Sequence, residues 1–258
     1  MPIVVAFVHV VGAIGAGKSS MLERAVRRPT EFLAALGRLP EFAWLAAWPP
    51  LGAGTELAVA LEEPARWVAA DGQSLLDCMY AEPTRYAAEF QTAVLRDRLR
   101  AAAAALCDAL RRATVDTSHV LVVTDGSVDV DHSVFARGCY EAGVMTTDEW
   151  VAYDDVYGRV ERVWAANLAQ MGVAVAVPLA ASVRGTLYLA TPLDETRKRI
   201  ELRGRACERR LEPAYLGGVI ERLEYLLASA AYPATPVARV RDTPPDAAEP
   251  FEPIEAVV

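Results

Sequence analysis

The stretch GAIGAGKSS at residues 12–20 has the spacing of a phosphate-binding loop: two glycines separated by four residues, then Lys18 and Ser19. Glycine permits backbone angles and close approaches that a Cβ would forbid, so the amide groups of such a loop can surround an anion. Lys18 would neutralise charge on β- and γ-phosphates, and the Ser19 hydroxyl would be a ligand of Mg²⁺. The pattern therefore predicts a site for a nucleoside triphosphate.

The segments on either side of the loop support this interpretation. The apolar run PIVVAFVHVV precedes it and the amphipathic segment MLERAVRR follows it, so the loop joins a strand to the N-terminus of a helix. Such a terminus attracts anions, whereas an ordinary Gly-rich turn has no need of this context. The residues predicted to surround the triphosphate are Gly12, Ala13, Ile14, Gly15, Ala16, Gly17, Lys18, Ser19 and Ser20.

Acidic residues follow two other apolar runs. EEPARW, which contains Glu62 and Glu63, comes after LAVAL, and Asp125 comes after VLVVT. Functional side chains gather at the carboxyl ends of parallel strands, so we expect these acids near Lys18. One carboxylate could accept a hydroxyl proton during attack on a γ-phosphate, and Asp125 could hold Mg²⁺. The alternative is that they cap helices, since acids favour a first helical turn.

The elements that must position these residues alternate along the chain. Hydrophobic patterns predict strands near 3–11, 57–62, 119–124, 185–190 and 235–240, and helices near 18–36, 64–79, 84–113, 131–141, 147–171, 192–203 and 212–230. This alternation predicts an α/β fold with a five-stranded parallel sheet flanked by helices. We expect one domain over residues 1–240, a packed insertion at 38–56, and a flexible acidic, Pro-rich tail over 241–258.

The composition excludes several classes of protein. A formal charge of −8 over 258 residues argues against a nucleic-acid partner, which requires concentrated Lys and Arg. Four widely spaced cysteines fit a reducing compartment. The first strand has no basic leader before it, and apolar stretches are broken well short of a membrane span. We therefore expect a cytoplasmic protein without a membrane partner.

Four further segments complete a family pattern. EEPARW, MYAEPTRYAAEFQTAVLRDRL, DGSVDVDHSVFARGCYEAGVMTTDEW and LYLATPLDETRKRIELRGR resemble, in order, the motifs of the deoxyribonucleoside kinases. That family includes deoxycytidine and deoxyguanosine kinases and, more remotely, herpesviral thymidine kinases. The resemblance covers most of residues 3–230. It implies a P-loop kinase fold with an Arg-rich lid, ATP and Mg²⁺ as cofactors, a deoxyribonucleoside as acceptor, and a homodimer built on long helices.

The resemblance also implies a general base for the sugar 5′-hydroxyl. Glu63 directly precedes Pro64, as the family's glutamate does, and is the favoured candidate. Glu62, however, lies at the family's usual interval from Trp67, so both glutamates remain candidates.

Five positions match those that hold the nucleoside in the family. Trp67 would line the base pocket, unless it serves only core packing; Tyr80 would contact the sugar 3′-hydroxyl. Gln91 would pair with the base edge through its amide, which is both donor and acceptor. Arg98 and Asp131 would read the base and favour an amino-substituted one over thymine. The alternative for Arg98 is a surface ion pair with a neighbouring helix residue.

Arginines in RKRIELRGRACERR match the family's lid over the donor phosphates. Arg199, Arg203 and Arg205 would stabilise charge that develops during phosphoryl transfer. Glu208 follows at the lid position that contacts the 3′-hydroxyl. A solvated basic helix end is the alternative.

One position departs from the family pattern. This chain has Asp125, Gly126 and Ser127 where the family has an acid, an arginine and a serine; that arginine helps to hold the 5′-oxygen and the catalytic carboxylate. Three interpretations of this departure remain open. Phosphoryl transfer could be slower, or another arginine such as Arg66 or Arg137 could replace the missing one. The protein could also be a nucleotide-binding relative with a regulatory or scaffold role. A kinase for another small nucleoside is a further alternative.

Overall fold

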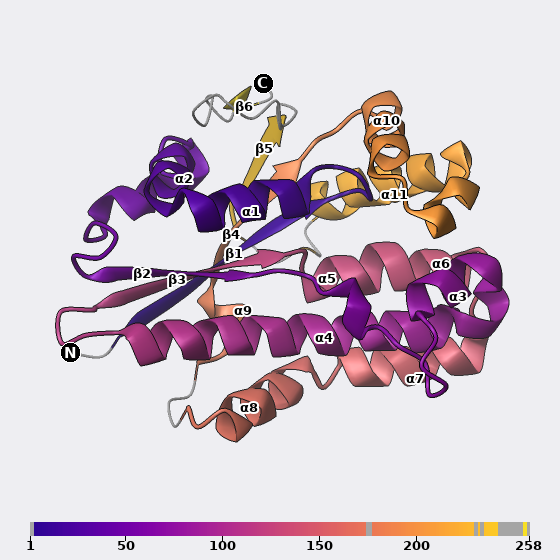
Figure 1. The fold of residues 1–258 in the computed structure, drawn as a ribbon, viewed down its shortest axis with the longest axis horizontal. Coiled ribbons are helices and arrows are strands. Elements are labelled where there is room, and N and C mark those ends of the chain that lie inside the picture. The colour runs from indigo at the N-terminus through magenta and orange to yellow at the C-terminus, as the bar shows by residue number, and fades with distance from the viewer. Residues whose placement is uncertain (1–2, 174–176, 230–231, 233–234, 242–254, 257–258) are drawn as a thin grey trace.

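The computed structural model describes residues 3–173, 177–229, 232, 235–241 and 255–256. Their strands form one sheet in the order β2-β3-β1-β4-β5-β6, with helices on both faces (Figure 1). The parallel strands are β1 (Val4–Gly12), β2 (Thr55–Ala60), β3 (His119–Asp125), β4 (Val183–Leu189) and β5 (Val237–Arg241). The predicted five-stranded parallel sheet is thereby confirmed. A short antiparallel strand, β6 (Glu255–Ala256), pairs with β5.

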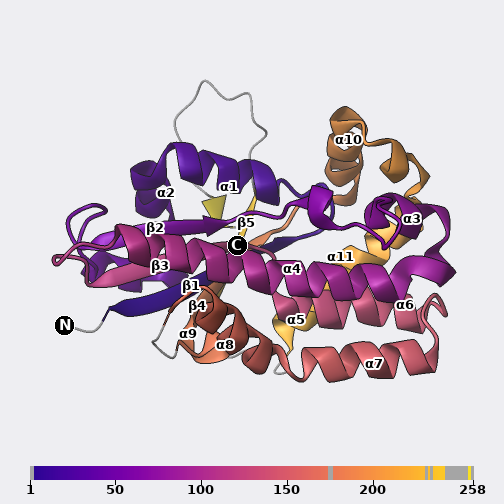
Figure 2. The same cartoon turned by 60° about the horizontal axis from the view of Figure 1, so that its bottom comes forward.

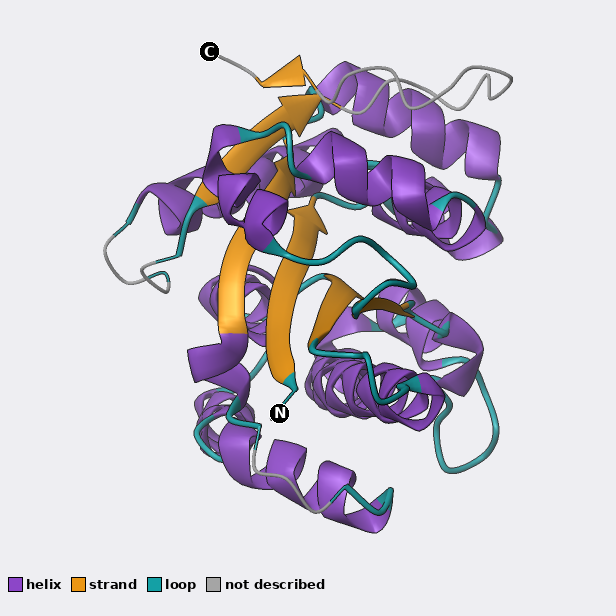
Figure 3. Ribbon diagram, turned by 90° about the vertical axis from the view of Figure 1, so that its left-hand side faces the viewer, coloured by secondary structure: helices purple, strands orange, loops and turns teal. Residues whose placement is uncertain are grey.

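Side chains alternate between two buried layers along the central strand β1. Val8 and Val10 pack in a core with α1 (Lys18–Arg27) and α2 (Pro29–Leu36). Phe7 packs on the opposite face, in a core with α4 (Pro83–Arg112), α8 (Val160–Gln170) and α9 (Leu179–Ser182). Burial on both faces explains the continuous apolar run that predicts this strand. Figure 3 shows the helical layers on the two sides of the sheet.

The remaining helices gather beyond the carboxyl ends of the strands, toward the right of Figures 1 and 2. They are α3 (Leu75–Ala81), α5 (Val128–Val130), α6 (Arg137–Glu141), α7 (Thr147–Tyr157), α10 (Leu193–Arg203) and α11 (Pro213–Ala228). A wide helical turn, Asp131–Ala136, joins α5 to α6, so this helical segment begins before the predicted residue 131. This arrangement places the helices around the edge of the sheet where the predicted site residues lie.

The predicted continuous helix over residues 64–79 is wrong over its middle part, residues 67–74. Only Pro64–Arg66 forms a short 3₁₀ turn, and α3 begins at Leu75. The Ser74 hydroxyl accepts a hydrogen bond from the Asp77 amide and caps the new helix. The chain therefore makes a loop between Trp67 and Ser74 instead of continuing as a helix.

Two other predicted helices are each divided. The helix expected over 18–36 breaks at Arg28, because Pro29 has no amide hydrogen and begins α2. The helix expected over 147–171 ends at Tyr157, passes through Gly158 and resumes at Val160 as α8. Apolar periodicity on both sides of each break hides it in the sequence.

The insertion is packed, as predicted, and the surface that it covers is the sheet. Its 3₁₀ helix, Pro40–Ala47, buries Phe42 against Gly185 of β4, and the Trp48 ring lies 4.5 Å from that of His119. Residues 242–254 and 257–258 of the predicted flexible tail lie outside the described residues. In the part of the chain that is described, no helix is both long and apolar enough to cross a membrane.

Candidate active site

The glycine-rich loop connects β1 to α1 and packs closely against its neighbours. Gly15 has φ of +79°, and a Cβ there would lie 2.8 Å from the Thr196 carbonyl oxygen on α10. Only glycine meets both requirements without strain. The Lys18 ammonium donates to the carbonyl oxygens of Gly12 and Ala13, each at 3.1 Å, so this side chain folds back over the loop.

Five of the nine predicted loop residues line a cavity: Gly12, Ile14, Gly15, Lys18 and Ser19. The other four support or flank the loop, since Ala13 and Ala16 are buried, Gly17 precedes α1, and Ser20 is exposed.

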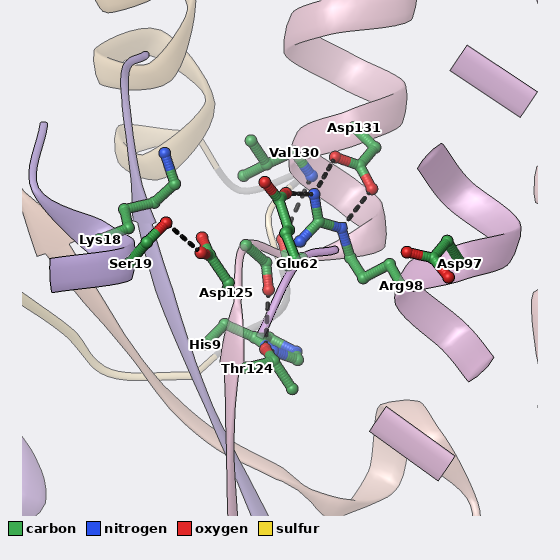
Figure 4. Close-up of polar contacts among 12 residues, drawn as sticks. His9, Lys18, Ser19, Glu62, Asp97, Arg98, Thr124, Asp125, Val130 and Asp131 are labelled. Atoms are coloured by element: carbon green, nitrogen blue, oxygen red, sulfur yellow. Dashed lines mark hydrogen bonds and ion pairs between the residues drawn. The ribbon is translucent and has the colours of Figure 1, made fainter. Parts of the chain in front are cut away.

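The loop and the end of β3 meet at Ser19 and Asp125. Ser19 Oγ donates to Asp125 Oδ2 at 2.8 Å, whereas buried Asp125 Oδ1 has no hydrogen-bond partner among the described residues (Figure 4). Burial and, secondly, the nearby charge of Glu62 raise the pKa of Asp125 to about 6. A hydroxyl oxygen and a carboxylate with an unused oxygen form the kind of donor set that Mg²⁺ takes, alongside water and phosphate oxygens. The residues present therefore fit this ion.

The cavity holds about 260 Å³ and continues from the loop into the group of helices beyond the sheet. Its wall includes all six residues that the sequence predicts to bind the nucleoside: Trp67, Tyr80, Gln91, Arg98, Asp131 and Glu208. It also includes Glu62, Arg203 and Arg205. The structure thus brings these residues and those of the loop, from six separate segments of the chain, to one cavity.

One end of this cavity is aromatic. The Trp67 ring meets that of Phe90 edge to face at 5.6 Å, and Trp67 Nε1 donates to Asp97 Oδ2 at 3.2 Å. Gln91 is buried on α4, with Nε2 3.9 Å from the Cys139 sulfur, a weak acceptor. Burial raises the pKa of the Tyr80 phenol. Aromatic faces with a buried amide suit a planar heteroaromatic ring with polar edges.

Arg98 connects two carboxylates on the wall of the cavity. Its Nε and Nη2 donate to the two Asp131 oxygens at 2.5 and 2.9 Å, and Nη2 also donates to Glu62 Oε1 at 2.7 Å (Figure 4). Burial opposes the guanidinium charge, but the attraction of Asp131 and Glu62 outweighs it and raises the pKa of Arg98. The Arg98 side chain is only 9 % exposed, so the surface ion pair is wrong.

The two candidate glutamates point to different environments. Glu62 lines the cavity and contacts Arg98, whereas the Glu63 side chain is 52 % exposed and pairs with Arg66 at 2.5 Å. That hydrogen bond lowers the pKa of Glu63. Successive side chains of an extended segment point to opposite sides, and the chain turns at Pro64 directly afterwards. Placement therefore favours Glu62 over the sequence-based choice of Glu63.

The predicted lid arginines occupy two different places. Arg203 donates to both oxygens of buried Glu208 at 3.0 and 2.7 Å, and Arg205 lies 3.4 Å from the same carboxylate. Arg199 instead donates to the Ala16 carbonyl oxygen of the loop at 2.9 Å and pairs with Glu195. Two arginines thus lie in the cavity wall, and the third supports the loop.

Several residues of this region are not among those predicted from the sequence. Phe90 and Tyr215 line the cavity; helical adjacency to Gln91 could have indicated the first, but no motif marks the second. Beneath the site, His9 Nδ1 lies 2.7 Å from Thr124 Oγ1, which donates to the Gly126 carbonyl oxygen at 2.7 Å. Because the hydroxyl has one hydrogen, Nδ1 must be the donor to it, and burial lowers the pKa of His9 to about 4.

Known proteins of one family are similar to this chain. The family model "Deoxynucleoside kinase" matches residues 49–243, which begin after the glycine-rich loop. Deoxycytidine kinase 2 of Gallus gallus is 30 % identical over 154 residues, which are 60 % of this chain and 50 % of the relative. Human deoxycytidine kinase is 30 % identical over 155 residues, 60 % of this chain and 52 % of the relative. The matched segment thus spans about half the length of these relatives. With a family match over most of its residues, the chain belongs to the deoxynucleoside kinase family.

Proposed function

We propose that this protein transfers the γ-phosphoryl group of ATP to the 5′-hydroxyl of a deoxyribonucleoside. One observation carries the proposal: Lys18 and Ser19 of the loop line the same cavity as Trp67 and Gln91 of the aromatic end, and Glu62 lines it too. Glu62 contacts Arg98 and acts on the pKa of Asp125, so it lies near both groups. Phosphoryl transfer requires donor, acceptor and proton acceptor to meet in this way.

The donor side is assigned to the glycine-rich loop. Its amide groups and Lys18 would bind the triphosphate, and Ser19 with Asp125 would hold Mg²⁺. A bound Mg²⁺ neutralises charge on the phosphate oxygens. The family resemblance supports ATP and Mg²⁺ here, and the unused oxygen of Asp125 supports the metal independently. Arg203 and Arg205 add positive charge to the same cavity.

The acceptor side is assigned to the aromatic end of the cavity. Trp67 and Phe90 would contact the base, and the Gln91 amide would pair with its edge. Tyr80 and Glu208 would contact the sugar 3′-hydroxyl, as the family resemblance implies; both line the cavity. These groups would place the 5′-hydroxyl toward the loop.

Glu62 is the proposed general base. Its carboxylate would accept the 5′-hydroxyl proton while that oxygen forms a bond to the γ-phosphorus. The bond from the γ-phosphorus to the bridging oxygen breaks at the same time, and that oxygen leaves with ADP. The product is the nucleoside 5′-monophosphate, a step of nucleotide salvage.

The purified protein tests this directly. With γ-labelled ATP and Mg²⁺, we expect label to enter the 5′-monophosphate of at least one deoxynucleoside, and Glu62→Gln to serve as the inactive control. Ribonucleosides in parallel reactions test the alternative acceptor class. Failure to label any nucleoside would contradict the proposal.

A second candidate is a nucleotide-binding relative with impaired transfer and a regulatory or scaffold role. Gly126 favours it, since the family has an arginine at this position. Calorimetry distinguishes the two: saturable binding of ATP–Mg²⁺ without labelled product would support the second candidate.

A further inference from the structure

Gly126 directly follows β3 and has a backbone conformation that other residues rarely adopt. Its φ is +82°, and a Cβ there would lie 2.7 Å from Cζ and 2.9 Å from Nη2 of Arg98. The Gly126 amide donates to the Val10 carbonyl oxygen at 2.7 Å, and its carbonyl oxygen accepts from Thr124 at 2.7 Å. The backbone is thus held on both sides, and the space that a side chain would fill contains the Arg98 guanidinium.

Arg98 is held in this space mainly by Asp131. The two bonds to the Asp131 carboxylate engage Nε and Nη2, which fixes the plane of the guanidinium. Asp131 is buried, with 3 % of its side chain exposed, so solvent does not compete for this pair. Nη2 also donates to Glu62 Oε1 at 2.7 Å. Asp131 therefore fixes the orientation of the Arg98 guanidinium, and the guanidinium in turn holds the Glu62 carboxylate.

We propose that Arg98 is a positioning residue for Glu62, placed in the space that Gly126 leaves open. The inference rests on the proposed role of Glu62 as general base. By binding Oε1, Arg98 directs the carboxylate so that Oε2 takes the proton of the acceptor hydroxyl. The proposal differs from base reading in one measurable respect: positioning affects transfer to every acceptor alike, whereas base reading affects the choice between acceptors.

The first test separates kcat from KM. We expect Arg98→Met to lower kcat about 100-fold or more for every accepted nucleoside while KM changes little, and Arg98→Lys to retain part of kcat. Arg96→Met, at an exposed position of the same helix, is the matched control and keeps wild-type kcat. Unchanged kcat, with only the relative KM of different bases altered, would overturn the proposal.

The second test asks whether Arg98 acts through Glu62. If it does, the double variant Arg98→Met with Glu62→Gln is no slower than Glu62→Gln alone, because the group that Arg98 positions is already lost. If kcat of the double variant fell by the product of the two single-variant factors, the two residues would act separately.

The third test addresses the space at Gly126. Gly126→Ala should displace Arg98 and lower kcat, but should have little further effect once Arg98→Met is present. Gly172→Ala is the control, because Gly172 also has φ of +82° but has no atom within 4 Å of a built Cβ. If Gly126→Ala and Gly172→Ala lowered kcat equally, the effect would be assigned to backbone strain. The space beside Gly126 would then have no role in placing Arg98.

A readout without catalysis keeps this inference separate from the proposed function. If the wild-type protein transfers no phosphate, the proposed function fails, and the contact is still measurable by thermal unfolding. We expect the shifts in unfolding midpoint caused by Arg98→Met and Glu62→Gln to be non-additive. Additive shifts would overturn the coupling between the two residues.

Discussion

Ser19 Oγ donates a 2.8 Å hydrogen bond to Asp125 Oδ2 and so joins the start of α1 to the end of β3 across 106 positions of the chain. The pairing of Val10 with Asp125 in the parallel sheet brings the two segments together. The other oxygen of Asp125 is buried and has no hydrogen-bond partner in the described part of the chain. A carboxylate in this state is suited to a cation that arrives with a phosphate ligand.

The first prediction concerns this carboxylate. Asp125→Asn should abolish most of the Mg²⁺-dependent stabilisation by ATP, because an amide is a much weaker ligand than a carboxylate. Thermal unfolding with ATP, in the presence of Mg²⁺ or EDTA, measures the effect. In the wild-type protein, Mg²⁺ should raise the unfolding temperature well above that with EDTA. An equal Mg²⁺ effect in wild type and variant would argue against Asp125 as a ligand.

A second prediction concerns Lys18. Lys18→Met removes the charge and two hydrogen bonds to the loop carbonyls but keeps most of the side-chain volume. We expect kcat to fall by about two to three orders of magnitude, as when a preorganised charge-stabilising donor is lost. Circular dichroism should show an unchanged fold. A turnover number equal to that of the wild type would exclude the loop as donor site.

The third prediction distinguishes the two adjacent glutamates. Glu62→Gln should lower kcat by about 10²–10⁴-fold with a small change in nucleoside affinity, because it removes proton acceptance but not side-chain volume. Glu63→Gln, the matched control, should cost little, because this side chain is half exposed and pairs with Arg66. The reverse ranking of the two variants would return the general base to Glu63.

A fourth prediction follows from His9. Its folded pKa of about 4 lies below its ordinary value of 6.5, so the unfolded chain binds more protons between these values. The contribution of neutral His9 to stability is therefore complete above about pH 6.5 and is lost as the pH falls toward 4, by roughly 3 kcal/mol. Asp125 acts in the opposite direction, since its raised folded pKa favours the folded state as the pH falls through about 6.

His9→Gln separates the two groups, because glutamine also offers a hydrogen-bond donor but does not titrate. Urea unfolding at several pH values between 7.5 and 4.5 should show a smaller acid loss of stability in the variant than in the wild type. His119→Gln provides a control at another histidine. Parallel curves for wild type and His9→Gln would contradict the assigned pKa.

The last prediction concerns assembly. The family resemblance implies a homodimer built on long helices, so sedimentation at micromolar concentration should give twice the 27.9 kDa mass of the chain. A single species with the mass of one chain would count against this expectation.

Much of the fold is determined locally. Continuous Val- and Leu-rich runs mark strands that are buried on both faces, and all five parallel strands lie within a few residues of their predicted positions. The glycine spacing likewise marks the loop, because Gly17 adopts a φ of +100° and a Cβ at Gly12 would lie 2.9 Å from that of Ala16. Apolar periodicity alone does not mark the breaks at Arg28 and Gly158, since it continues through both.

The site itself depended on the tertiary structure. The sequence places Glu62 and Glu63 side by side, but outside a regular strand no fixed period states which one faces the cavity. Likewise, the sequence shows only that Gly126 stands where the family has an arginine. The fold shows that Arg98, a residue of α4 that lies 28 positions earlier, fills the space beside this glycine. Contacts of this kind depend on how whole helices and strands pack together. Neither the residue types nor their spacing in the sequence determines that packing.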